Sequence, residues 1–185
     1  MNIKVTIQGI TPLLCNRFTD EASLSNGTSA AIRVGKKGTP REQCEPKLYT
    51  DSVNTKGIPG CNVLAALVGA GRFIKAGRKT LTTVKSSIVP AGVTVDELLC
   101  VLTPQSWEVD SRSVVSPATG GRVMCHRPRF DKWTLSFSLA VDDTLFAPDV
   151  VRQLLDEAGK KIGLGDFRPE RRGPFGRFVV IGWKI

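Results

Sequence analysis

The sequence predicts a single α+β domain, and three observations lead to this prediction. Residues 2–10 and 132–141 alternate apolar and polar side chains with period two, which is typical of strands with one buried face. Two segments that begin near Pro59 and Pro148 carry apolar residues at helical spacing. A short apolar run, residues 178–183, reads as a final strand. The order strand, helix, one or two strands, strand, helix, strand is the ferredoxin-like βαββαβ pattern, which RNA-recognition modules share.

The first half of the pattern contains a strand, a helix and a less regular segment. Gly9 and Pro12 close the first strand, and residues 13–15 are an alternative extension of it past a bulge. The first helix has small residues around its apolar stripe, so we expect it to pack closely on a sheet. Residues 86–109 are expected to hold one or two strands. The helical stripe comprises Val63, Leu64, Leu67, Val68 and Ile74.

The second half contains the clearest strand of the chain, at residues 132–141. A second helix is expected from about Pro148 to Ala158, and Gly159 suits the C′ position that ends it. The buried face of the strand is predicted to comprise Trp133, Leu135, Phe137, Leu139 and Val141.

Two insertions, at about 16–57 and 110–131, interrupt this domain of residues 1–185. The first holds few apolar residues and sustains no helical or strand period. Its middle, residues 33–41, carries basic residues and no acid, which fits either a mobile basic loop that orders on a partner or a solvated loop. In the second insertion, Gly120-Gly121 could close a hairpin.

The charge balance points to a polyanionic partner. The chain of 185 residues carries 26 Lys and Arg against 17 Asp and Glu, a net charge of +9. Nucleic acid is the first candidate partner and an anionic membrane the second. No apolar run approaches the roughly 18–20 residues that span a bilayer, and the N-terminus begins as a strand rather than a signal peptide. The five cysteines include no C-x-x-C pair, so we expect reduced, mostly buried thiols in a cytoplasmic protein.

The sequence offers little support for catalysis. His126 is the only histidine, and its neighbour Cys125 would point to the opposite face of a strand. Asp142 follows a strand and is expected to begin a turn. No P-loop, dinucleotide fingerprint or H-E-x-x-H motif occurs, so we expect a non-enzyme without cofactor or metal.

Residues 158–178 are rich in glycine and arginine, with phenylalanines interleaved. Glycine permits close backbone approach to a ligand, and arginine forks match phosphate geometry. Phe167 is the best stacking candidate in this stretch, since Phe175 and Phe178 lead into the final strand and suit the core. Basic clusters at 33–41, 72–85, 112–132 and 160–177 all fall in predicted loops or at helix ends. They indicate a phosphate-binding track, with scattered surface charge as the alternative.

Two segments resemble the RAMP superfamily of CRISPR-associated proteins. Residues 161–178 resemble the glycine-rich loop between the last helix and last strand of those proteins. Residues 57–67 are similar to the "IPGSSLKGALR" segment that opens the first helix of the guide-binding backbone subunits, the Cas-seven group. Cys61-Asn62 and Ala65 stand where that segment has Ser-Ser and Lys, which implies weaker or redistributed phosphate contacts.

The resemblance implies a non-catalytic subunit that binds guide RNA (crRNA) along its backbone. Such subunits stack into a helical filament with copies of themselves and with other effector subunits, in an antiviral ribonucleoprotein that pairs its guide with target nucleic acid. A hairpin insertion, the thumb, wedges into the guide, and residues 110–131 are the candidate thumb, with Met124 and Phe130 as wedges. RNA-cleaving members carry an aspartate after the first strand. Asp20 lies in that region in surroundings that do not match, so cleavage is not carried over.

The predicted RNA contacts follow from the glycine-rich stretch and the basic clusters. Two alternatives stay open: a RAMP-type endoribonuclease that processes repeat RNA with His126 as base, and a stand-alone phage or mobile-element protein that binds single-stranded nucleic acid. The residues predicted to contact phosphate are Gly163 and Gly165, through their backbone, and Arg168, Arg171, Arg172 and Arg177, through their side chains. The residues predicted to extend this track are Arg72, Lys75, Arg122, Arg127 and Arg129. Phe167 and Met124 are predicted to contact bases.

Overall fold

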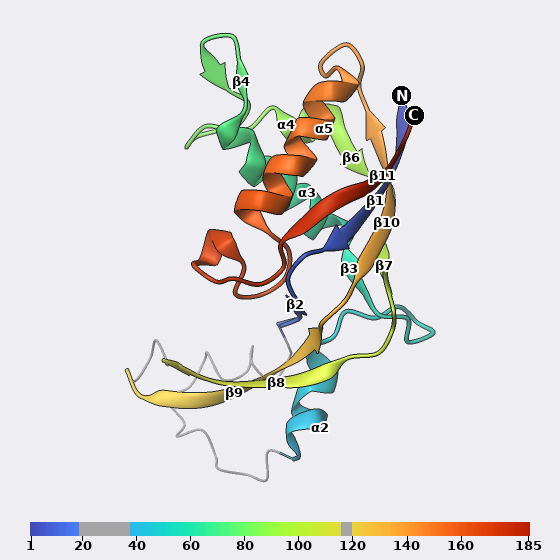
Figure 1. Ribbon diagram of the computed structural model, residues 1–185. Coiled ribbons are helices and arrows are strands. Elements are labelled where there is room, and N and C mark those ends of the chain that lie inside the picture. The colour runs from blue at the N-terminus through green and yellow to red at the C-terminus, as the bar shows by residue number, and fades with distance from the viewer. Residues whose placement is uncertain (19–37, 116–119) are drawn as a thin grey trace.

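The computed structural model of the chain describes residues 1–18, 38–115 and 120–185. The fold is α+β, with antiparallel sheets and a few helices (Figure 1). The main sheet has the strand order β11-β1-β10-β7-β3, and β6 also pairs with β10. Its strands are β1 (Asn2–Gly9), β3 (Gly57–Pro59), β6 (Val93–Val95), β7 (Leu99–Thr103), β10 (Thr134–Val141) and β11 (Phe178–Lys184).

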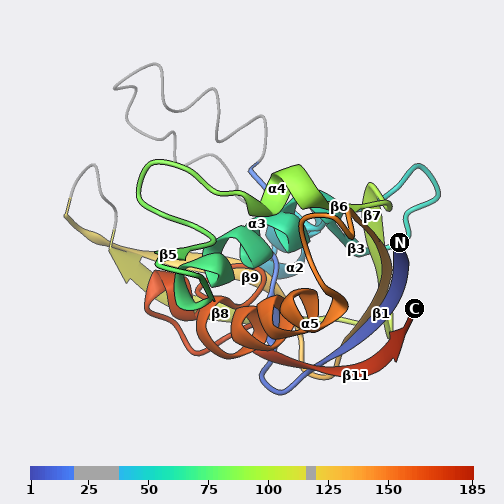
Figure 2. The ribbon, with the colours of Figure 1, turned by 90° about the horizontal axis from the view of Figure 1, so that it is seen from above.

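The predicted alternation of β1 and β10 is confirmed. Val5 pairs with Phe137 and Ile7 with Leu135, and all of these side chains are buried. On the opposite face, the Thr6 and Ser136 hydroxyls lie 3.0 Å apart at the surface. Helices α3 (Gly60–Ala70) and α5 (Pro148–Glu157) cover the apolar face, while the polar face stays open (Figure 2).

The first predicted helix is confirmed as α3. Pro59 occupies the N-cap position, and the 3₁₀ turn η2 (Gly71–Phe73) continues the helix. The segment predicted to hold one or two strands contains β6 and β7, preceded by a short helix. This short helix is α4 (Val89–Gly92). Two short strands, β4 (Lys75–Ala76) and β5 (Lys79–Thr80), lie between α3 and α4 in the chain.

The prediction that Gly159 ends the second helix is wrong. Helix α5 continues through a π-helical turn, η3 (Ala158–Ile162), and Gly163 with φ 76° ends it in the left-handed region. Gly159 has a different role, because a Cβ there would lie 2.1 Å from the backbone oxygen of Phe178. The glycine allows the helix to approach the start of β11.

The described part of the first insertion contains regular secondary structure. Residues 38–57 contain α2 (Pro40–Cys44) and the 3₁₀ turn η1 (Glu45–Lys47), and Cys44 joins the core. A capping box starts α2: the Glu42 N–H donates to Thr39 Oγ1 over 3.3 Å, and the Thr39 N–H donates to Glu42 Oε2 over 2.6 Å. Asp20 and most of the predicted basic loop at 33–41 lie outside the described residues.

The second insertion forms a hairpin, as predicted. Strands β8 (Glu108–Val115) and β9 (Arg122–Phe130) pair from Glu108↔Arg129 to Val115↔Arg122 and project from the body (Figure 1). Strand β2 (Leu13–Leu14) pairs with β9 and so belongs to the hairpin sheet rather than extending β1. Because of this pairing Phe130 is only 1% exposed, so its prediction as a wedge is wrong, whereas Met124 is 58% exposed.

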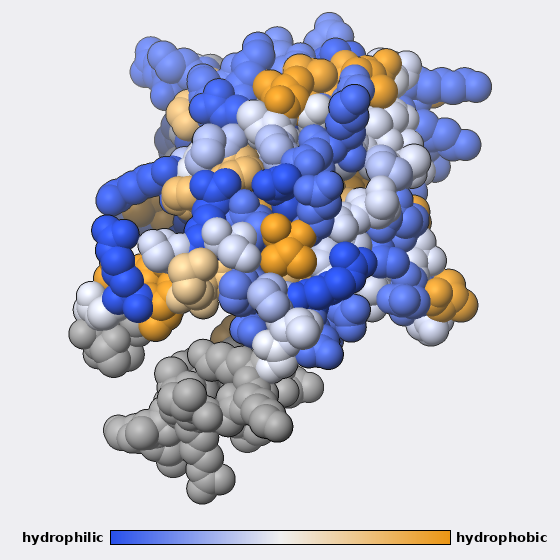
Figure 3. Space-filling view, turned by 60° about the horizontal axis from the view of Figure 1, so that its bottom comes forward, coloured by the Kyte–Doolittle hydropathy of each residue, from blue (hydrophilic) through white to orange (hydrophobic). Residues whose placement is uncertain are grey.

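The surface around the hairpin is largely polar. In the space-filling view, hydrophilic residues predominate and apolar residues form separate small patches (Figure 3). Within residues 1–18, 38–115 and 120–185, no helix has the length and apolar character needed to span a membrane.

Candidate nucleic-acid interface

A cleft of about 220 Å³ lies where the start of α3 meets the glycine-rich loop. The two segments come from distant parts of the chain, yet their backbones form facing walls. They are also the segments that resemble RAMP proteins. The lining residues are Asn16, Tyr49, Asn62, Ala65, Ala66, Gly163, Leu164, Gly165, Asp166 and Arg168.

The N-terminus of α3 adjoins this cleft, which Asn62 lines. Pro59 has no side-chain cap to offer, and the Gly60 N–H donates to Leu98 O over 3.0 Å. The next two N–H groups, of Cys61 and Asn62, have no acceptor within the helix because of helix geometry. The end of the helix therefore carries a partial positive charge, which favours an anion.

Tyr49 and Asn62 add side-chain donors. Burial raises the pKa of the Tyr49 hydroxyl, and the hydrogen bond with Asn62 opposes this shift only in part. The hydroxyl therefore keeps its proton at neutral pH. Phenol and amide groups can both donate to phosphate oxygens.

The glycine-rich loop needs its glycines for packing as well as for access. Gly165 has φ 74°, and a Cβ there would lie 2.4 Å from Leu14 O. In the described part of the chain its N–H has no acceptor, so it remains available at the cleft. The Gly163 N–H donates to Ala158 O over 2.8 Å, so its prediction as a phosphate donor is wrong.

Arg168, one of the predicted phosphate contacts, lines the cleft and is partly neutralised by an acid. Its Nη1 donates to Gly165 O over 3.0 Å, and its Nη2 donates to Glu170 Oε2 over 2.7 Å. Arg72 Nη2 lies 3.8 Å from the other oxygen of Glu170. Glu170 thus pairs with two of the arginines predicted to contact phosphate.

Three further arginines of the loop region remain uncompensated. Arg171, Arg172 and Arg177 are exposed, and no acidic side chain of the described residues pairs with them. Arg172 has φ 62° and follows the 3₁₀ turn η4 (Pro169–Arg171). These side chains supply positive charge that a polyanion can reach.

The hairpin arginines Arg127 and Arg129 are mainly structural, which corrects their prediction as available phosphate contacts. Arg127 Nε lies 2.7 Å from Asp166 Oδ2. Arg129 contacts Asp131 at 2.8 Å, along with Glu108 at 3.0 Å and the buried Asp110 at 3.8 Å. Each of these arginines already has a carboxylate partner.

Among solved structures, the fold is similar to a chain in the cryo-EM structure of the Type III-B Cmr-beta bound to cognate target RNA. The TM-score is 0.53. The sequences are 14% identical over an alignment that covers 99% of this chain and 59% of that chain, so the likeness concerns the fold. No family model matches the sequence, and no curated protein matches it.

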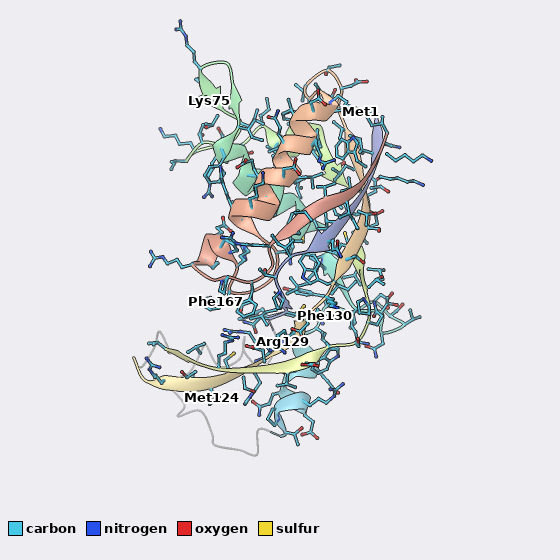
Figure 4. All side chains as sticks on the ribbon, in the orientation of Figure 1. Met1, Lys75, Met124, Arg129, Phe130 and Phe167 are labelled. Carbon is cyan, nitrogen blue, oxygen red and sulfur yellow. The ribbon has the colours of Figure 1, made fainter. Side chains whose placement is uncertain are left out.

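The other predicted contacts spread over two ends of the molecule. Met124 lies on the hairpin together with Arg122, whose Nη1 is 3.4 Å from Ser113 Oγ. Lys75 projects from β4 at the opposite end (Figure 4). The structure therefore does not bring Lys75 to the cleft.

His126 lies on the hairpin and is not among the residues that line the cleft. Its Nδ1 is 2.7 Å from Ser111 Oγ on the paired strand. Cys125 Sγ is 3.8 Å from Lys47 Nζ. The predicted opposition of the Cys125 and His126 side chains agrees with these separate partners.

Sequence reasoning missed four cleft residues: Asn16, Tyr49, Asn62 as a donor, and Asp166. Asp166 carried a usable signal, since it is an acid within a basic stretch. Tyr49 lies in the segment predicted to lack structure and carried none. Asn16 follows β2 and lies 3.1 Å from Asp166, a contact between distant positions that no local signal could have shown.

Proposed function

We propose that this chain is a non-catalytic subunit of a CRISPR-type effector complex that binds guide RNA along its backbone. The observation that carries the proposal is the cleft between α3 and the glycine-rich loop. Both segments resemble RAMP proteins in sequence, and they meet around a polar space. Exposed arginines without an acidic partner among the described residues follow in the same loop region. The similarity to a chain of an RNA-bound Cmr-beta complex supports the same assignment.

The topology supports a ferredoxin-like core as part of this proposal. The order β11-β1-β10-β7 places the last strand beside the first and the two inner strands next to each other. Helices α3 and α5 connect these strands on one face. The βαββαβ pattern requires this arrangement of four antiparallel strands.

The chemistry of the cleft suits a phosphodiester. The donors at the cleft are the N–H groups of Gly165 and Asn62 and the hydroxyl of Tyr49, and we expect them to contact phosphate rather than a base. Donors of this kind fix the register of a nucleic acid without selecting its sequence. A guide-binding subunit needs this property because its guides vary.

Assembly along the RNA is the second part of the proposal. Each copy would contribute one cleft, and the hairpin with Met124 would reach the bases or the neighbouring copy. Other effector subunits and the paired target nucleic acid would complete the particle. The chain spans 59% of the length of the matching Cmr-beta chain. We therefore propose these partners for the chain and do not infer them from the structural similarity.

Binding to single-stranded RNAs of increasing length tests both parts. We expect the number of bound copies to rise with RNA length, and the RNA to remain intact. A fixed 1:1 complex at every length would contradict assembly, and absence of binding would contradict the RNA-binding role. DNA oligomers of the same sequence are the matched control, since selection of RNA requires contact with the 2′-hydroxyl.

A further inference from the structure

Phe167 has a backbone conformation that is unusual for its residue type. Its φ is 49°, in the left-handed region that glycine and asparagine adopt far more readily than an aromatic residue. The surrounding loop enforces this conformation. The Phe167 N–H donates to Asp166 Oδ1 over 2.9 Å, and a Cβ on Gly173 would lie 1.7 Å from Phe167 O.

Phe167 carries the exposed ring of a cluster that also contains Phe175 and Arg112. It is 37% exposed, and its centroid lies 6.0 Å from that of the buried Phe175 with an interplanar angle of 36°. The Arg112 guanidinium lies over the Phe175 ring at 4.8 Å. Arg112 is in turn held by Asp110, whose carboxylate oxygens lie 3.0 and 2.8 Å from Nε.

This cluster holds the ring in place, and the two chain neighbours of Phe167 line the cleft. These neighbours in the sequence are Asp166 and Arg168. In space, Phe167 lies at the edge of the glycine-rich loop that faces the hairpin (Figure 4). The exposed Arg171 and Arg172 belong to the same loop. An exposed ring beside phosphate donors matches a nucleotide, which has an anionic backbone and an aromatic base.

We propose that Phe167 is a stacking site for one unpaired nucleobase of the RNA whose phosphate occupies the cleft. This inference rests on the proposed function and adds a base contact to it. The occupant is a base of any identity, because every base offers a π face to an aromatic ring. A strained backbone at an aromatic residue whose ring is partly exposed is a reason to expect a functional contact of that ring.

Fluorescence of RNA that carries a single 2-aminopurine, moved one position at a time, tests the stacking site. Wild-type protein is expected to quench the probe at defined positions. Phe167→Leu should abolish this quenching and weaken RNA binding about 5- to 100-fold for each stacked base. Phe167→Tyr should keep both. Phe73→Leu is the matched control, because Phe73 is 49% exposed on η2 and contacts Lys161 of η3 rather than Phe175 or Arg112.

A second measurement keeps the test independent of any folding defect. Wild-type protein is titrated with RNA that has an abasic site at the quenched position, and the same loss of affinity is expected. If wild-type protein binds RNA but neither Phe167→Leu nor the abasic site changes affinity or quenching, the stacking site is overturned while the proposed function stands. If wild-type protein binds no RNA, both are overturned.

Discussion

Arg127 and Asp166 join the hairpin to the glycine-rich loop, with Nε 2.7 Å from Oδ2. Their side chains are 11% and 30% exposed, so the pair lies largely out of solvent. Asn16 adds a hydrogen bond of 3.1 Å to the same carboxylate oxygen, and the Asp166 N–H donates to Leu14 O over 2.8 Å. This pair fixes the position of the hairpin relative to the cleft.

Removal of Asp166 should destabilise the protein. Asp166→Ala leaves the Arg127 charge buried without a partner, and we expect the free energy of unfolding to fall by about 1–3 kcal/mol in urea denaturation. Glu108→Ala is the control, since Glu108 is 70% exposed and pairs with Arg129 at the surface. Its effect should stay below about 1 kcal/mol. Equal effects of the two substitutions would contradict a structural role for the pair.

Alanine at Gly159 should be costly although alanine favours helices. The added Cβ would meet the backbone oxygen of Phe178 at 2.1 Å, and a backbone atom cannot move away cheaply. We expect Gly159→Ala to cost about 3 kcal/mol or more in thermal or urea unfolding. In Gly69→Ala the nearest atom is the flexible Ile162 Cδ1 at 3.1 Å, so this helical control should change stability by at most about 1 kcal/mol. A neutral Gly159→Ala would show that α5 does not approach β11 this closely.

Alkaline pH should destabilise the fold through buried thiols, of which Cys15 and Cys100 have the largest rise in pKa. Burial raises the pKa of Cys15 and of Cys100 from the ordinary 9.0 to about 12, and the Asp166 and Glu97 carboxylates respectively add to the shifts. Above pH 9 the unfolded chain releases these protons while the folded chain keeps them. The free energy of unfolding should therefore fall as pH rises from 9 toward 12, by up to about 1.4 kcal/mol per pH unit for each thiol.

Urea unfolding of cysteine variants at several pH values checks this dependence. The series runs from about pH 8 to about pH 10.5, so its upper end lies about one and a half units above the ordinary thiol pKa. Cys15→Ala and Cys100→Ala should each flatten the fall, whatever stability they lose at pH 8. Cys61→Ala, at an exposed position, should change the slope least, because Cys61 adds only the smallest of the three contributions to the raised pKa of Cys100. The same slope in all variants would assign the alkaline loss to other groups.

Uncompensated and paired arginines should differ in their effects on RNA binding. Arg171→Gln and Arg172→Gln should each reduce affinity and lower the slope of log affinity against log salt concentration by about 0.7, because each removes one phosphate contact. Their stability should change by less than about 0.5 kcal/mol. Arg129→Gln should instead lower stability, because it removes a partner of the buried Asp110. Salt titration and urea unfolding of the same variants separate the two classes, and a loss of salt dependence in Arg129→Gln alone would reverse the assignment.

Local patterns in the sequence predicted the parts of the fold that depend on local periodicity. The alternation of Ile3, Val5 and Ile7 identified the buried face of β1, since one face of this sheet packs on helices. The capping box of Thr39 and Glu42 was present in the sequence, but it starts a helix of five residues that is too short to show a period. A capping box can therefore be overlooked when the helix that follows it is too short to add a hydrophobic period.

The pairing of charges could not be predicted in the same way. Asn16 and Asp166 are separated by 150 positions, and Arg127 reaches the same carboxylate from the hairpin. Such contacts depend on how the sheet and the hairpin close, which no local pattern encodes. The sequence showed where arginines gather, and only the structure separates those that hold the fold from those left for a ligand.

The affinity of Asn62→Asp for single-stranded RNA shows whether the cleft holds the RNA backbone. Asn62 lies at the third position of α3, where an acid complements the helix dipole, so the melting temperature should stay equal or rise. A carboxylate in the cleft would repel phosphate, and we predict an RNA affinity at least about tenfold weaker. Asn62→Ser, which keeps an uncharged donor, should bind like wild type. Unchanged RNA affinity in a folded Asn62→Asp variant would contradict the claim that the cleft holds the RNA backbone.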